Sequence, residues 1–181
     1  MFKKFTVEEN VSSTSQIKNS VQRGIQAQIV SQYPKLEPII EQLVPKKSML
    51  VAKCQDHIQL VLINGEVMFF NQRDGPFFPT LKVLHKFPSM MPIMQVDKGA
   101  IKFVLSGANI MCPGFTSPGG SLSIEVDVEQ PVAIFAEGKQ HPLAIGLTKM
   151  STSQIKDVNK GIAVENIHYL MDGLWLTPLI Q

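Results

Sequence analysis

The sequence predicts an α+β protein, in which a small N-terminal α/β domain with a β-hairpin spans residues 1–91 and a domain of short strands and short helices spans residues 92–181. Three observations predict this division: apolar residues with a helical period before residue 34, a hairpin signal at Asn64-Gly65, and short apolar runs between glycine turns after Pro92. With 44% hydrophobic and 18% charged residues among 181, the composition indicates a folded chain of one or two domains.

The first expected element is an amphipathic helix over residues 15–33. Isoleucine or valine recurs every four residues along one face, at Ile17, Val21, Ile25 and Ile29. Pro34 ends this helix, because the residue before a proline disfavours helical geometry. A second short helix is expected over residues 36–43, followed by a strand over residues 49–53.

A β-hairpin is expected next, from strands over residues 57–63 and 66–70 joined by Asn64-Gly65, the dipeptide that best fits a two-residue type I′ turn. This turn predicts the cross-strand pairs Ile63–Glu66, Leu62–Val67, Val61–Met68 and Leu60–Phe69. One face then belongs to the core, and the other carries Val61, Met68 and Phe70. Because an apolar second face needs a cover, either the N-terminal helix or a partner protein, we predict partner binding by these three residues.

A helix is expected over residues 80–87, and Pro88 ends it. The second half is expected to alternate between short strands and turns, with one further helix over residues 151–160. The expected strands are residues 93–96, 109–112, 132–136, 143–147 and 161–167.

Charge is distributed unevenly along the chain. Residues 1–92 carry 11 basic and 7 acidic side chains, a net charge of +4, whereas residues 93–181 carry 6 and 8, a net charge of −2. An RNA site in the second half must therefore be a small local patch. The sequence opens without a signal-peptide pattern and has no apolar run of about 18 residues, so we expect a cytoplasmic protein without membrane contact. Two cysteines, Cys54 and Cys112, are too few for a disulfide framework and are expected to be buried thiols.

A basic helix face has the clearest binding chemistry in the sequence. Residues 97–106 are expected to form a short helix that Asp97 caps and Gly107 ends. At about 100° per residue, its inner arc is Ala100, Ile101, Phe103, Val104 and Leu105, and its outer face is Lys98, Gly99, Lys102 and Ser106. Two ammonium groups four residues apart suit a run of phosphates, and a glycine lets a ligand backbone come close. The residues alone leave open that this is an ordinary solvated face.

The run from Val96 to Gly114 resembles the opening of a PUA domain, the fold of pseudouridine synthases and archaeosine transglycosylases. Later PUA landmarks follow in order, at Ala144-Ile-Gly146, Gly161-Ile-Ala-Val164 and Asp172-Gly-Leu-Trp175. Together with Met1-Phe-Lys-Lys-Phe5, Gly75-Pro-Phe-Phe-Pro-Thr-Leu81 and His85-Lys-Phe-Pro88, they make the chain resemble, nearly end to end, the family of malignant T-cell-amplified sequence proteins and fungal translation-machinery-associated proteins. The resemblance implies that the second domain is a PUA-type β pseudo-barrel.

The resemblance also implies a function, that of a non-catalytic translation factor on the small ribosomal subunit, in a heterodimer with density-regulated protein. Such a pair is expected to promote release of deacylated tRNA, post-termination ribosome recycling, reinitiation and non-standard initiation. Its RNA ligands would be small-subunit rRNA and, as a further candidate, the acceptor end of tRNA; no cofactor is implied. The RNA-facing residues would be Lys98, Gly99, Lys102, Ser106, Gly107, Asn109, Met111 and Pro113, with Lys139 added from its place in a turn between strands.

Two other functions stay open: a PUA-containing accessory subunit of an RNA-modifying enzyme, and an adaptor that binds only protein. Against an enzyme, the first 91 residues are too few to build a deep catalytic pocket. Cys54 and His57 resemble half a zinc site, but a structural site needs four ligands and no matching pair follows, so we expect no metal. Trp175 is expected to be buried in the small barrel, with base stacking as the alternative.

Overall fold

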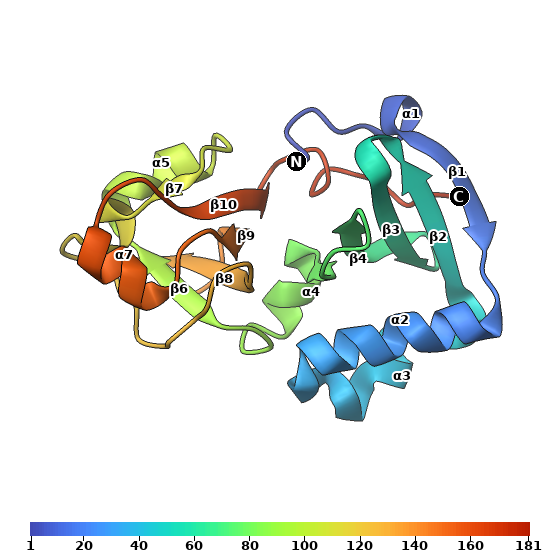
Figure 1. Cartoon of the computed structure of the whole chain (residues 1–181). Coiled ribbons are helices and arrows are strands. Elements are labelled where there is room, and N and C mark those ends of the chain that lie inside the picture. Colours follow the sequence, from blue (N-terminus) through green and yellow to red (C-terminus); the bar gives the residue numbers. More distant parts are fainter.

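The computed structural model describes residues 1–181 and contains two five-stranded β-sheets, with helix α4 between them (Figure 1). The first sheet has the order β1 (Val11–Gln16), β2 (Met49–Cys54), β3 (Ile58–Ile63), β4 (Glu66–Gln72) and β5 (Phe78–Pro79). The second has the order β6 (Ile93–Val96), β8 (Pro131–Ala136), β9 (Ala144–Thr148), β10 (Ile162–Tyr169) and β7 (Ile110–Met111). The predicted α+β class is confirmed.

The helices are short, apart from one. They are α1 (Val7–Asn10), α2 (Asn19–Gln32), α3 (Ile40–Leu43), α4 (Leu81–Lys86), α5 (Ile101–Val104), α6 (Pro113–Thr116) and α7 (Thr152–Val158). Turns of 3₁₀ helix precede α3, over Pro34–Ile39, and α5, over Lys98–Ala100. None of these helices combines the length and the apolar character that a bilayer crossing requires.

Helix α2 begins later than the apolar pattern predicts, because residues 11–16 form β1, which pairs antiparallel with β2. Its buried side chains are Gln22, Ile25, Gln26 and Ile29. The prediction that Val21 belongs to the packed face was wrong, since Val21 is 46% exposed. Gln26 takes part in this face because its side-chain amide donates to the backbone carbonyl of Val44 at 2.6 Å, so its burial leaves no donor unpaired there.

The predicted hairpin is confirmed at its turn. Asn64 and Gly65 have φ angles of 52° and 81°, as a type I′ turn demands of both central residues. A side chain at residue 65 would also meet the carbonyl oxygen of Ile180 at 2.9 Å, so the turn needs glycine for space as well as for conformation. The chain therefore brings its C-terminal segment onto this turn.

The register of the hairpin is correct only next to the turn. Ile63 pairs with Glu66 and Leu62 with Val67, as predicted, but a β-bulge then shifts the strands so that Val61 faces Phe69 and Leu60 faces Phe70. The predicted pairs Val61–Met68 and Leu60–Phe69 were wrong. Alternation of apolar residues cannot reveal the extra residue, because both faces of these strands are apolar.

The three side chains predicted to contact a partner are buried inside the chain. Val61, Met68 and Phe70 are 0, 7 and 0% exposed. The ring of Phe70 meets the edge of Phe2 at 4.8 Å between centroids and stacks on Phe78 at 5.4 Å. The second face of the hairpin is thus covered by the protein itself, and the prediction of a partner surface on these residues is corrected.

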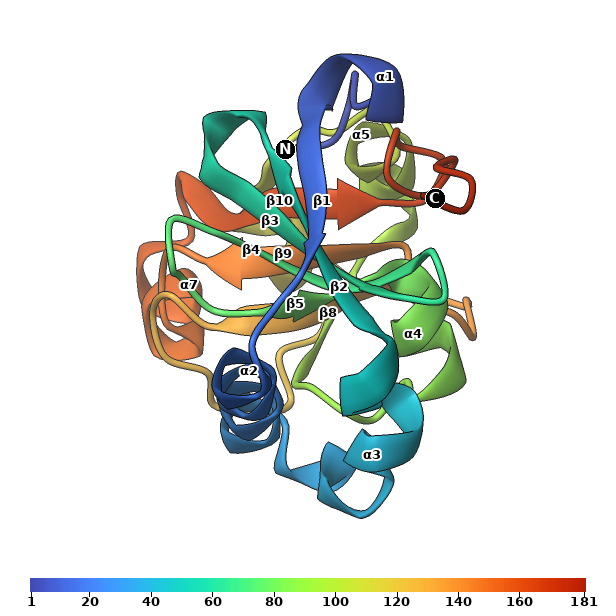
Figure 2. The same ribbon diagram turned by 90° about the vertical axis from the view of Figure 1, so that its right-hand side faces the viewer.

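The second sheet is covered on both faces, which explains its nearly continuous apolar strands. Strand β6 runs parallel to β8, and the other pairs are antiparallel. Val132 and Ile134 point into the core that this sheet shares with α5, α6 and α7. Ala133, Ile145 and Ile167 join the core of the first sheet instead. Figure 2 shows the first sheet lying directly in front of the second.

The segment after β10 returns to the first sheet (Figure 1). The N–H of Gly173 donates to the carbonyl of Phe2, and the N–H of Ile180 donates to the carbonyl of Gly65, both at 2.8 Å. Leu174 and Ile180 are buried in the core of the first sheet. The last twelve residues therefore pack largely outside the second sheet. The predicted domain limits, 1–91 and 92–181, stay a prediction.

Candidate nucleic-acid interface

A groove of about 550 Å³ lies between the segment leading into and through α5 and the segment around β7. One wall is built from Asp97, Gly99, Ala100, Phe103 and Val104, and the other from Ala108, Asn109, Ile110, Met111, Pro113, Gly114 and Ser117. We call it the α5 groove. Four of the residues predicted to face RNA therefore line one hollow: Gly99, Asn109, Met111 and Pro113.

The remaining predicted residues lie around the rim of the α5 groove. Lys98, Lys102 and Ser106 are exposed on the same segment. Lys139 is exposed on the turn after β8, and the side chain of Lys98 passes this turn, since its Cε lies 3.9 Å from the space that a Cβ on Gly138 would occupy. Four of the nine predicted residues thus line the groove, four more adjoin it on the same stretch of sequence, and Lys139 lies on the turn next to Lys98.

Asp97 caps the α5 segment, as predicted. Its carboxylate accepts from the N–H of Ala100 at 2.9 Å. Its own N–H donates to the carbonyl of Gly114 at 3.0 Å, which ties the two walls of the groove together. Gly107 ends the segment with a φ of 91°, and its Cα packs so closely on the Tyr169 ring that a Cβ would lie 3.0 Å from it. Gly107 therefore has a structural reason for its identity besides any contact with RNA.

The apolar inner arc predicted for α5 was partly wrong. Val104 is buried, but Phe103 is 56% and Leu105 39% exposed. The segment is one 3₁₀ turn followed by one α turn, so the projection of a regular helix misplaces its side chains. Phe103 and the 48% exposed Met111 give the groove an apolar lining, and the ammonium of Lys102 lies 5.1 Å from the Phe103 ring centre.

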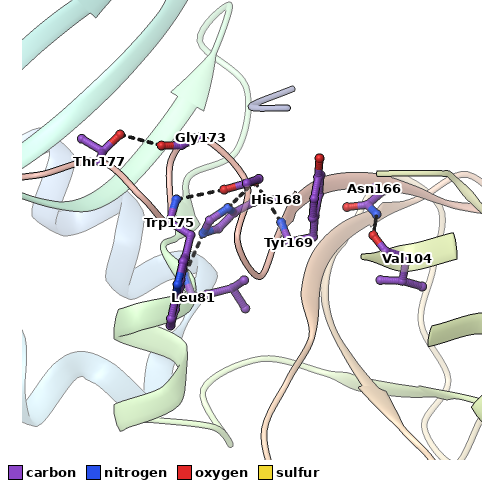
Figure 3. A network of polar contacts seen from close by, with 9 residues as sticks. Leu81, Val104, Asn166, His168, Tyr169, Gly173, Trp175 and Thr177 are labelled. Carbon is purple, nitrogen blue, oxygen red and sulfur yellow. Dashed lines mark hydrogen bonds and ion pairs between the residues drawn. The ribbon is translucent and has the colours of Figure 1, made fainter. Parts of the chain in front are cut away.

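Asn166 on β10 fixes the far wall of the groove, and the sequence analysis missed it. Its side-chain amide donates to the carbonyl of Val104 at 3.0 Å (Figure 3). It also donates to the carbonyl of Ala108 at 3.1 Å, and the backbone N–H of Asn166 donates to the side-chain oxygen of Asn109. These bonds hold the loop between α5 and β7. The available signal was an asparagine within the predicted strand of residues 161–167, where a buried amide must have hydrogen-bond partners.

The charges around the groove favour an anion. Lys98, Lys102 and Lys139 are exposed, whereas the Asp97 carboxylate is engaged in the cap. The Glu137 carboxylate lies against Gly119, in the loop that follows Ser117 of the groove lining. Flexible ammonium groups around an apolar floor suit a chain whose phosphates contact the rim while its bases contact rings and aliphatic side chains.

Groups typical of catalysis are held in structural roles. His168 and Asp172 form a buried pair, with 2.8 Å between Nδ1 and Oδ2, but His168 Nε2 accepts the N–H of Leu81 at 3.1 Å (Figure 3). Both ring nitrogens are therefore occupied. Burial raises the pKa of Cys54 to about 11 and also raises the pKa of Cys112, which keeps both thiols protonated near neutral pH. The structure gathers no group of three or more His, Cys, Asp or Glu side chains.

Trp175 is not in the barrel, where the sequence predicted it. It is half-buried beside α4, and its backbone N–H donates to Asp172 Oδ1 at 2.9 Å. Its ring lies 5.5 Å from the ring of His85. The residue was misplaced because the chain after β10 leaves the second sheet, which no local pattern shows.

Comparison with known proteins matches both halves of the chain. Residues 5–88 match the model of the Pre-PUA-like domain, and residues 92–170 match that of the PUA domain. Malignant T-cell-amplified sequence 1-A of Xenopus laevis is 56% identical over 176 residues, 97% of each chain. The homologue of malignant T-cell-amplified sequence 1 in Dictyostelium discoideum is 53% identical over 182 residues, 100% of each chain. The match thus extends through the α5 groove and the C-terminal segment.

Solved structures agree with the fold. A hypothetical protein of the archaeon Pyrococcus horikoshii OT3 superposes with a TM-score of 0.71 at 27% identity, covering 90% of this chain and 98% of the other. A conserved PUA domain protein from Thermoplasma acidophilum gives a TM-score of 0.64 at 22% identity, covering 90% and 97%. The predicted PUA-type architecture is confirmed.

Proposed function

Because this chain belongs to the family of malignant T-cell-amplified sequence proteins, with a Pre-PUA-like domain followed by a PUA domain, we propose that it is a non-catalytic translation factor of the cytoplasm that binds RNA of the small ribosomal subunit. It acts there as a heterodimer with density-regulated protein. The pair promotes release of deacylated tRNA, post-termination recycling, reinitiation and non-standard initiation, and the acceptor end of tRNA is a second RNA ligand of the PUA domain.

The observation that carries the proposal is the α5 groove with its rim of lysines. Lys98 and Lys102 flank an apolar hollow that Phe103 and Met111 line. Phosphate contacts give affinity and orientation, and contacts to bases give what selectivity the site has. The two halves of the chain carry net charges of +4 and −2, so binding in the second half depends on this local cluster.

A non-catalytic role is supported by the state of the reactive side chains. The His168 ring is closed off by the Leu81 N–H and Asp172, and both thiols have raised pKa values. A nucleophile or a general base needs an accessible, correctly ionised group. Besides the Asp97 carboxylate that caps α5, the groove offers asparagine, serine and apolar side chains and the rim offers lysines, which bind and orient RNA.

A protein partner is supported by a second groove, of about 340 Å³, between the N-terminal segment and the C-terminal segment. Met171 and Leu176 line it and are 65% and 60% exposed, among the most exposed large apolar side chains of the chain. Lys3, Lys4 and Glu8 stand on its other side, where the two lysines outnumber the glutamate. Exposed apolar side chains gathered in one place mark protein interaction sites, and the two lysines suit a partner segment that combines acidic and apolar residues.

Sedimentation with purified small ribosomal subunits tests the proposal. The chain should co-sediment with small subunits, more completely when density-regulated protein is present, and should leave large subunits unbound. Binding should weaken as salt rises, because phosphate contacts release counterions. Absence of co-sedimentation at low salt, with and without the partner, would overturn the proposal. Conversion of a labelled RNA into a modified product by the chain would replace it with an enzymatic function.

A further inference from the structure

Three aromatic rings from distant parts of the chain form a ladder at the junction of the two sheets. Trp175 lies next to His85 on α4, at 5.5 Å between centroids, and His85 lies next to His141, at 5.4 Å with an interplanar angle of 31°. We call these residues the ring ladder. The three come from the first half of the chain, from the turn after β8 and from the C-terminal segment, so the ladder exists only in the assembled fold.

Specific hydrogen bonds hold the rings in place. His85 Nε2 donates to the carbonyl of Pro142 at 3.0 Å, which anchors α4 to the turn that carries His141. The backbone of Trp175 is held by the buried Asp172 carboxylate. His141 itself is exposed, and its ring is supported on one face by His85. The outer face of His141 therefore faces solvent at the end of a row of three tilted rings, with interplanar angles of 54° between Trp175 and His85 and 31° between His85 and His141.

Cations surround the ring ladder. Helix α4 exposes Lys82 and Lys86, one turn apart, and the ammonium of Lys82 lies 5.6 Å from the centre of the Trp175 ring. Lys139 precedes His141 by two residues and is exposed. Two carboxylates are near. Asp172 is buried and engaged with His168 and with the backbone N–H groups of Tyr169 and Trp175. Glu66 shares a hollow of about 290 Å³ with Lys82 and one of about 410 Å³ with Lys86. The three exposed lysines outnumber these two carboxylates, so the patch is positive.

One turn links the ring ladder to the rim of the α5 groove. The turn of residues 137–141 touches Lys98 of the groove at Gly138 and carries His141 of the ladder three residues later. Three residues span at most roughly 10 Å, less than two nucleotides of extended single strand. A strand that leaves the groove past Lys98 and Lys139 therefore meets the ring ladder next.

We propose that the ring ladder, with Lys82, Lys86 and Lys139, is a second RNA-binding surface that takes an unpaired nucleotide next to the segment held in the α5 groove. A base stacks on the outer face of His141, and the lysines contact the flanking phosphates. The inference rests on the proposed RNA binding and deepens it. Single-stranded RNA is the class of ligand that the patch fits, because an unpaired base alone offers a free face to stack.

The chain has one tryptophan, and it lies in the ring ladder, so its fluorescence reports on this site alone. Titration with an unstructured RNA of a dozen nucleotides should change the emission of Trp175 with the same midpoint as the anisotropy of the labelled RNA. In the variant Lys98→Glu/Lys102→Glu the anisotropy midpoint should shift while the emission change at saturation persists. If the anisotropy shows RNA binding while the emission of Trp175 stays unchanged, the ring ladder does not bind RNA. The proposed function is unaffected by that result.

Variants give a second, independent readout. His141→Ala removes an exposed ring and should weaken binding of this RNA about 5- to 10-fold. Lys82→Gln/Lys86→Gln should lower the slope of log affinity against log salt by roughly 1 to 2. The matched control is Lys18→Gln/Arg23→Gln, two exposed cations at the start of α2. An equal loss of RNA affinity in the control pair and in the test pair would mean that the patch acts only through general surface charge, and would overturn the inference. If the unmodified chain binds no RNA, the proposed function is overturned as well.

Discussion

The imidazole of His168, on the last strand of the second sheet, accepts the backbone N–H of Leu81, the first residue of α4, at 3.1 Å between Nε2 and N. Acceptance at Nε2 places the proton of the neutral ring on Nδ1, which donates to Asp172 at 2.8 Å. Asp172 also accepts from the N–H groups of Tyr169 and Trp175. One buried histidine thus links the helix between the sheets to the turn that starts the C-terminal segment.

Replacing His168 with leucine should destabilise the fold. The change keeps bulk but leaves the Leu81 N–H without its acceptor and takes one of the donors from the Asp172 carboxylate, both in a dry environment. We expect a loss of at least about 2 kcal/mol in the free energy of unfolding. Urea denaturation followed by circular dichroism measures it. Lys156→Ala, on an exposed helix face, is the control, and equal midpoints for both variants would refute a role of His168 in joining the sheets.

Reversing the charge of Lys98 and Lys102 should weaken RNA binding. Both side chains are exposed, so Lys98→Glu/Lys102→Glu should fold normally. Each lost phosphate contact lowers the slope of log affinity against log salt by about 0.7 to 0.9, so the slope should fall by roughly 1 to 2. Small-subunit or tRNA binding at several salt concentrations gives the slope, with the single change Lys156→Glu on α7 as control. Unchanged slope and affinity in a folded protein would move the RNA site to the more basic first half.

Phe70→Ala should act on stability, because the Phe70 side chain is fully buried against Phe2 and Phe78. A buried phenylalanine replaced by alanine costs about 3 to 5 kcal/mol. The matched control is Phe103→Ala, since Phe103 is 56% exposed and should cost far less stability. Thermal unfolding of the two variants provides the comparison. A stable Phe70→Ala protein with weakened partner affinity would instead restore the original assignment of Phe70 to the partner surface.

Charges placed in the groove between the two termini should weaken the heterodimer. Met171→Asp/Leu176→Asp removes two exposed apolar anchors and should lower affinity for density-regulated protein by about 1 to 3 kcal/mol, leaving RNA binding by the α5 groove intact. Calorimetric titration measures the affinity. Val158→Asp, at a 59% exposed valine on the opposite side, controls for the loss of surface hydrophobicity. Undiminished affinity in the double variant would place the partner elsewhere.

Alkylation of Cys54 in the folded protein should require a higher pH than alkylation of an exposed cysteine. Burial raises the pKa of its thiol from 9.0 to about 11, so the folded protein keeps a proton that the unfolded chain releases between these values. Folding stability should therefore fall as pH rises from about 9 to 11. Mass spectrometry of iodoacetamide-treated protein should show slow modification of Cys54 at pH 9 in buffer and rapid modification in urea. Equal rates would mean that the thiol is accessible and ordinary.

The fold followed from the sequence where its signals are local. Asn64-Gly65 gave the hairpin turn, Thr80 and Asp97 gave the starts of their helical segments, and β6 spans the predicted residues 93–96. The errors arose where one residue or a distant segment decides the outcome. A bulge at Met68 changed the hairpin register, and a 3₁₀ turn before α5 exposed Phe103. Neither leaves a trace in apolar periodicity.

The candidate RNA site was predictable in its charges and less so in its architecture. Lys98 and Lys102 are visible as a helical pair, and the resemblance added the strand that faces them. Asn166 and the ring ladder depend on contacts between residues far apart in sequence, such as the 57 positions that separate His85 from Pro142. Single-sequence patterns carry no information about such pairs, so these features required the three-dimensional structure.

The hydrogen bond from Ile180 to Gly65 sets a condition on biosynthesis. A polypeptide emerges from the ribosome with its N-terminus first, so the hairpin leaves the exit tunnel long before its last packing partners. The carbonyl of Phe2 gains its donor only from Gly173, and the hairpin turn gains its contact only from Ile180. The N-terminal half therefore lacks these contacts, and the cover that Leu174 and Ile180 give its core, until residues 173–180 have left the ribosome. Chaperones that shield nascent chains should consequently engage this protein until that segment has packed against the first sheet.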